Sequence, residues 1–132
     1  MTKVLIDTNI YSFAMKGDAA VVNALREMDR IGFSAISIGE LLSGFKGGTR
    51  EAQNREELHF FLDSPRVVLH PIDEETADFY GSILNNLRAG GTPIPTNDIW
   101  IAASAFQYGY KLFTRDSHFN FIPGLVLLKG EI

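Results

Sequence analysis

Four acidic residues occupy positions from which their side chains could act on one ligand: Asp7, Glu40, Asp98 and Asp116. Asp7 and Asp116 each follow a short apolar run, and Glu40 and Asp98 each fall in the first turn of an expected helix. Such runs, alternating with helical patterns, predict a parallel sheet, which gathers ligands at the carboxyl ends of its strands. Converging carboxylates repel one another unless a proton or a cation intervenes, and hard divalent ions prefer oxygen ligands. The pattern therefore predicts a Mg²⁺ or Mn²⁺ site, where a bound ion could lower the pKa of a bound water molecule.

Each acid also has a purely structural explanation. Asp7 could cap the helix that follows it, and Asp116 lies in a turn, where aspartate is common. Glu40 stands three residues after Ser37 in a capping-box pattern, and Asp98 suits the N-terminal end of a helix dipole. Neighbouring hydroxyl residues already supply candidate caps, however, so capping alone does not require acids at positions 40 and 98. The agreement of all four acids at one sheet edge favours the metal site.

Polar and basic residues near the acids could support the same chemistry. Hydrogen bonds to ligating carboxylates or to bound water are expected from Thr8, Asn9, Asn97 and Thr114, although Thr114 could equally be a strand residue without a role. His118 lies two residues after Asp116 and could approach a phosphate group. Four basic residues could contact a polyanionic backbone, although a solvated surface explains them equally well. They are Lys46, Arg50, Arg55 and Arg115.

Length and composition restrict the class of protein. The chain has 132 residues, of which 45% are hydrophobic and 21% charged, and this predicts one folded domain over residues 1–132. Cysteine is absent, which excludes a thiolate metal site and a cysteine nucleophile. The net charge of −4 excludes a nucleic-acid binder that depends on an overall basic field. No signal peptide or membrane-length apolar run is visible, so we expect a cytoplasmic protein with no membrane partner.

Apolar periodicity predicts alternating strands and helices. Strands are expected at residues 3–6, 33–36, 67–70, 111–114 and 125–128, and helices at residues 8–15, 19–29, 37–45, 50–62, 74–87 and 97–108. Asp18 and Asp73 are expected N-caps, Thr96 is expected to open the last helix, and Gly90-Gly91 to end the fifth. Helices that separate short strands predict a three-layer α/β/α sandwich around a parallel sheet of four or five strands.

Four segments carry a resemblance to a known family: Asp7-Thr8-Asn9, Glu40-Leu41-Leu42-Ser43-Gly44, Asp98-Ile99-Trp100-Ile101-Ala102-Ala103 and Leu112-Phe113-Thr114-Arg115-Asp116-Ser117-His118-Phe119. In this order, and over nearly the whole chain, they resemble the PIN domain. The resemblance is strongest to its VapC branch, the toxins of type II toxin–antitoxin pairs. It implies a PIN-like fold, acidic metal ligands at Asp7, Glu40, Asp98 and Asp116, and a supporting Thr114. It also implies Mg²⁺- or Mn²⁺-dependent cleavage of RNA, a VapB-like antitoxin that blocks the site, and a homodimer.

Three alternatives remain open at this point. A PIN-type nuclease could act in RNA processing or decay without being a toxin. A HAD-like phosphatase also begins with an aspartate after its first strand, but its chemistry needs a second aspartate two residues later, and position 9 is Asn. A non-catalytic interaction domain, in which the acids only cap helices, would bind no stoichiometric Mn²⁺.

Overall fold

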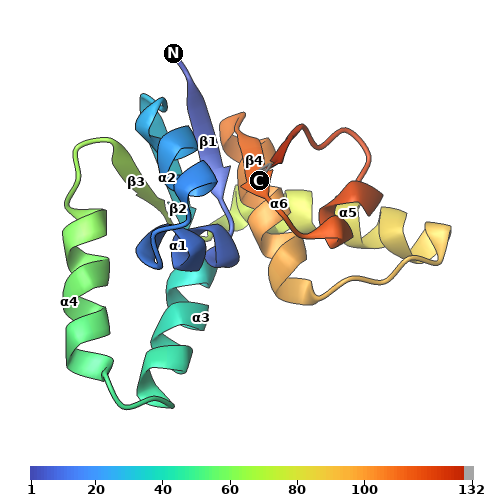
Figure 1. The fold of residues 1–132 in the computed structure, drawn as a ribbon. Coiled ribbons are helices and arrows are strands. Elements are labelled where there is room, and N and C mark those ends of the chain that lie inside the picture. The colour runs from blue at the N-terminus through green and yellow to red at the C-terminus, as the bar shows by residue number, and fades with distance from the viewer. Residues whose placement is uncertain (130–132) are drawn as a thin grey trace.

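The structure, a computed structural model, describes residues 1–129 and contains a parallel five-stranded sheet (Figure 1). The strand order is β3-β2-β1-β4-β5. The strands are β1 (Lys3–Ile6), β2 (Arg30–Ser34), β3 (Val67–His70), β4 (Lys111–Thr114) and β5 (Leu127–Lys129). The central position of β1 explains its apolar run Val4-Leu5-Ile6, because a strand covered on both faces buries its side chains.

Helices cover both faces of this sheet. They are α1 (Thr8–Met15), α2 (Ala19–Arg26), α3 (Ala35–Lys46), α4 (Glu51–Leu62), α5 (Glu74–Gly90) and α6 (Thr96–Tyr108), followed by the 3₁₀ turn η1 (Ser117–Phe121). Successive residues of β1 point to opposite faces. Val4 and Ile6 pack with residues of α1–α4, whereas Leu5 packs with residues of α5 and α6. The prediction of a three-layer α/β/α sandwich with a parallel sheet is confirmed.

Two neighbouring elements begin earlier than the sequence analysis predicts. We expected a strand at 33–36 and a helix from 37, but β2 spans Arg30–Ser34 and α3 starts at Ala35. The reason lies in the cap: the Ser34 hydroxyl accepts a hydrogen bond from Ile36 N (3.1 Å), so Ser34 ends the strand and opens the helix. Ser37 is therefore not the N-cap, and Glu40 lies in the second turn of α3 rather than the first.

Smaller corrections concern the ends of other elements. Helix α2 ends at Arg26 rather than at residue 29, and β5 begins at Leu127 rather than at residue 125. Helix α6 follows Pro95, and within this described part of the chain no side chain caps it, so the expected opening at Thr96 involves no side-chain hydrogen bond. The predicted caps Asp18 and Asp73 are confirmed. Within residues 1–129, no helix combines the length and apolarity that crossing a membrane requires.

Candidate metal centre

The four predicted acids line one small cavity of about 230 Å³. Asp7 follows β1 and Asp116 lies two residues after β4, and these strands are neighbours in register, with Ile6 opposite Phe113. Glu40 enters from α3, and Asp98 enters from the first turn of α6. The remaining residues that line the cavity are Thr8, Asn9 and Ile101. The strand order therefore brings together side chains that are up to 109 residues apart (116 − 7) in the sequence.

Asp7 is the most buried of the four acids, with only 4% of its surface exposed. Its Oδ1 accepts a hydrogen bond from Ile10 N (2.8 Å), which caps α1, and its Oδ2 accepts one from the buried Thr114 hydroxyl (2.5 Å). Burial raises the pKa of Asp7, and the negative charges of Asp116 and Glu40 add to this effect, while the two hydrogen bonds oppose it. The helix cap and a candidate ligand are thus the same residue.

Glu40 is held by polar side chains from two other helices, α1 and α6. The Thr8 hydroxyl donates to Glu40 Oε1 (2.6 Å), and the Asn97 amide donates to Oε2 (3.2 Å). Thr8 is also hydrogen-bonded to the buried Ser37 hydroxyl (2.9 Å). Sequence reasoning assigned Ser37 to a helix cap and so missed it here. Its distance of three residues from Glu40 on one helix was the signal that it shares a face with that acid.

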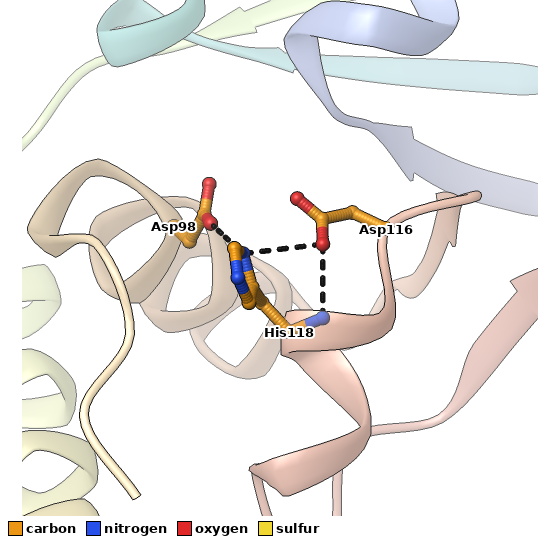
Figure 2. Close-up of side chains that lie close together, drawn as sticks. All are labelled: Asp98, Asp116 and His118. Atoms are coloured by element: carbon orange, nitrogen blue, oxygen red, sulfur yellow. Dashed lines mark hydrogen bonds and ion pairs between the residues drawn. The ribbon is translucent and has the colours of Figure 1, made fainter.

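The third group consists of Asp98, Asp116 and His118 (Figure 2). The His118 Nδ1 atom lies 3.4 Å from Asp98 Oδ2 and 3.2 Å from Asp116 Oδ1. Burial, together with the charge of Asp116, raises the pKa of Asp98 to about 6. Asp116 Oδ1 also accepts a hydrogen bond from His118 N (2.9 Å), and Asp116 N donates to the Thr114 hydroxyl (2.9 Å). Thr114 therefore bonds to both Asp7 and Asp116.

The predicted basic residues lie outside the cavity lining. Three of them surround the connection between α3 and α4, at the end of these helices that points away from the sheet in Figure 1. There Glu51 accepts a hydrogen bond from Arg55 Nε (3.0 Å) and lies 3.9 Å from Lys46 Nζ, while Arg50 Nε donates to Gln53 (2.7 Å). Arg115 follows β4 and donates two hydrogen bonds to Asp18, of 2.7 and 3.0 Å.

The donor set suits a hard divalent cation. All four acids offer carboxylate oxygens to one cavity, and two of them have a raised pKa, as expected for acids that lack a nearby positive ion. Oxygen-rich sites of this kind favour Mg²⁺ or Mn²⁺ over softer metals. The class of protein defined by this fold and site is thus a doubly wound α/β protein with an acidic centre at the carboxyl edge of its sheet.

Comparison with known proteins agrees with this description. The PIN domain family model matches residues 4–125. Ribonuclease VapC1 of Haemophilus influenzae (strain R2866) is 31% identical over 116 residues, which cover 85% of each chain. Two crystal structures resemble the fold closely. One is VapBC2 from Rickettsia felis, with a TM-score of 0.88, 27% identity and 97% and 98% of the two chains covered. The other is DNA-bound VapBC from Salmonella typhimurium, with a TM-score of 0.89, 25% identity and 99% and 100% covered.

The chain belongs to the PIN domain family and, within it, to the VapC proteins. This result confirms the resemblance that the four acidic segments carry, and it sets aside the HAD-like phosphatase. The cavity lined by the four acids is therefore the candidate active site of the chain.

Proposed function

We propose that this chain is an endoribonuclease that depends on Mg²⁺ or Mn²⁺. The observation that carries the proposal is the convergence of four carboxylates, from four separate segments, on one small cavity. The net charge of −4 gives RNA no general attraction to the protein, and a local cation would reverse the sign of the field at the site. The relative named Ribonuclease VapC1 supports RNA as the substrate.

In this proposal Asp7, Asp98 and Asp116 hold the cation directly, and Glu40 either holds it or orients a water molecule. A bound dication lowers the pKa of water and offsets the charge that develops on a phosphodiester under attack. Asn9 lines the same cavity and is exposed, so its amide can donate a hydrogen bond to a phosphate oxygen.

The supporting residues fix the direction of the acidic side chains. Thr114 orients Asp7 through its hydroxyl, which also accepts from the backbone of Asp116. Thr8 and Asn97 each donate to one oxygen of Glu40. Hydrogen bonds of this kind tune ligand basicity and geometry, and their loss commonly weakens metal binding about 10- to 100-fold.

Backbone contacts to RNA are part of the proposal at four residues, Lys46, Arg50, Arg55 and Arg115. The first three would meet RNA along the projecting α3–α4 pair. Arg115 would have to exchange part of its hydrogen bonding to Asp18 for a phosphate. Substitution of Arg115 would also remove the ion pair with Asp18, so its role in binding RNA has to be tested apart from that of the other three.

Asp7→Asn tests the proposal directly. The substitution keeps the size of the side chain and an oxygen for the Ile10 N–H group, so the fold should persist. It removes a charged ligand, and we expect Mg²⁺-dependent cleavage of RNA to fall at least about 100-fold. Cleavage is measured on a labelled RNA, with Asp78→Asn on the exposed side of α5 as the matched control. Near-normal cleavage by a folded Asp7→Asn protein would refute the assignment.

We further propose that the chain is the toxin of a pair in the cytoplasm, with a VapB-like antitoxin and a homodimeric state. The solved VapBC structures that it resembles support this partner. Induced expression should arrest growth, and co-expression of the product of a small adjacent open reading frame should relieve the arrest. Induced expression of the Asp7→Asn variant should not arrest growth, even when the antitoxin is absent. A wild-type chain that cuts RNA yet never affects growth would favour the alternative role in RNA processing or decay.

A further inference from the structure

The ring of His118 faces Asp98 and Asp116, although the packing of the turn η1 does not fix the ring in that direction. The side chain is 47% exposed on the short turn η1, and buried Phe119 and Ile122 anchor that segment instead. Packing therefore leaves the ring free to point outward. Instead, Nδ1 lies between the carboxylates of Asp98 and Asp116, as Figure 2 shows.

The two distances from the ring nitrogen to carboxylate oxygen are close to the spacing of adjacent ligands around a six-coordinate ion. In an octahedral complex with bonds of about 2.1 Å, adjacent ligand atoms lie about 3 Å apart and opposite ones about 4.2 Å apart. The two distances from Nδ1 to carboxylate oxygen are 3.2 and 3.4 Å, and one ligand atom from each of the three residues lies within 4.8 Å of the others. Only small movements would bring all three onto one ion.

We propose that His118 is a nitrogen ligand of the metal ion, completing a mixed site with Asp98 and Asp116. This inference rests on the proposed metal-dependent function and deepens it, because it concerns which metal the site selects. Carboxylates alone serve Mg²⁺ and Mn²⁺ similarly, whereas an imidazole nitrogen favours transition metals over Mg²⁺. The site is therefore built to hold Mn²⁺, or a later transition metal, more tightly than Mg²⁺.

The chain makes this ligand unusually easy to identify. It has three histidines and no cysteine. His70 is buried and hydrogen-bonded through Nε2 to the Tyr110 hydroxyl (2.7 Å), and His59 is exposed on α4. In the described part of the chain, His118 alone among the three has a ring nitrogen in ion-pair contact with acids of the site. An imidazole signal on a bound ion would thus point to His118.

The test compares the 132-residue chain with its His118→Gln variant, and with His59→Gln as the matched control. Mn²⁺ binding is followed by electron paramagnetic resonance, and pulsed measurements detect the nuclear modulation of a coordinated ¹⁴N atom. We expect this modulation in the wild type and in His59→Gln, and its loss in His118→Gln. We also expect His118→Gln to weaken Mn²⁺ binding about tenfold and Mg²⁺ binding, measured by competition, by less than about twofold.

Glutamine at position 118 separates this role from a hydrogen-bonding one, since its amide can still donate to either carboxylate but brings no imidazole. Stoichiometric Mn²⁺ binding without ¹⁴N modulation in the wild type would overturn the ligand role and leave the proposed metal-dependent function intact. Modulation that persists in His118→Gln, or an equal loss of Mn²⁺ and Mg²⁺ affinity, would also overturn it. A folded wild-type chain that binds no Mn²⁺ would overturn both the inference and the proposed function.

Discussion

At the scale of single residues, the ionised acids of the site lower the stability of the folded protein when no cation is bound. Asp98 has a pKa of about 6 in the folded protein, against an ordinary value of 3.8, because it is partly buried beside Asp116. The folded state therefore binds a proton more tightly than the unfolded state does. The stability of the metal-free protein should fall as the pH rises from about 4 to about 6, and the loss should be complete at pH 7.

Asp98→Asn should accordingly stabilise the metal-free protein at pH 7. The neutral amide removes the cost of an ionised, partly buried carboxylate, a gain of roughly 1–3 kcal/mol in the free energy of unfolding. The gain should shrink as the pH is lowered to 4, where the wild-type carboxyl is itself protonated. Urea unfolding in the presence of a chelator measures both values, with Asp78→Asn as a control. A variant that is no more stable than the wild type at pH 7 would contradict this account.

Two of the acids both accept a capping hydrogen bond and line the cavity, and for these the sequence alone could not separate the two roles. Asp7 and Asp116 each accept a capping hydrogen bond, as their structural explanation requires, and each also lines the cavity. Glu40 and Asp98 cap nothing in the described part of the chain, so these two carry the stronger sequence signal. The side-chain network around them depends on contacts between distant elements, which residue types and spacing do not reveal.

At the scale of elements, the sequence was most informative where short apolar runs and aspartate caps set the boundaries. The bounds of β1, β3, β4 and α1 follow from apolar runs that end at polar residues, and they agree with the structure. Strand β2 begins three residues earlier than predicted, because Gly32 lies inside the strand, opposite Leu5 of β1 and Val68 of β3. The space that a side chain at Gly32 would occupy is filled by Tyr110, from a distant part of the chain, whose Cζ lies 2.7 Å from where a Cβ would be. Local sequence contains no signal for that contact.

Gly32→Ala should therefore destabilise the protein. The added methyl group would meet the Tyr110 ring at 2.7 Å and Leu5 Cδ1 at 3.0 Å, and the Tyr110 ring is itself held by His70. We expect a loss of about 1–3 kcal/mol in unfolding free energy. Gly81→Ala in α5, whose Cβ would meet nothing within 4 Å, is the matched control and should stabilise by about 0.5–1 kcal/mol. An unchanged urea midpoint in Gly32→Ala would show that Tyr110 can move aside.

Arg115 connects the end of β4 to the start of α2. Its guanidinium group donates two hydrogen bonds to Asp18 and lies 4.7 Å from the centre of the Phe13 ring. Arg115→Lys keeps the charge but loses the paired hydrogen bonds and the stacking, so we expect a lower melting temperature at pH 7. Arg115 also lowers the pKa of Asp18, so this contribution is present above the ordinary pKa of aspartate and is lost at lower pH. The melting temperatures of wild type and variant should differ at pH 7, and the difference should narrow as the pH falls below 3.8; a difference that stays constant would exclude the ion pair as its cause.

At the scale of the whole molecule, the acids of the centre come from helices α3 and α6 and from the segments that follow strands β1 and β4, and thus from both helical layers and the edge of the sheet between them. An unfolded chain cannot offer these oxygens together. A dication that binds here binds the folded state alone, and it both neutralises the repulsion among the acids and joins the layers. The cost of burying these carboxylates next to one another, seen in the raised pKa values of Asp7 and Asp98, is then offset by the ion.

Mn²⁺ should therefore raise the stability of the entire fold. Binding only to the folded state adds about 2.7 kcal/mol when the free ion is at 100 times its dissociation constant. The melting temperature should rise with Mn²⁺ concentration and return to its starting value when a chelator is added. The same titration of Asp98→Asn should give a much smaller rise, although that variant starts from a higher melting temperature without metal. If Mn²⁺ leaves the wild-type melting temperature unchanged, the four carboxylates do not form a metal site, and a fold whose acids only cap helices becomes the better description.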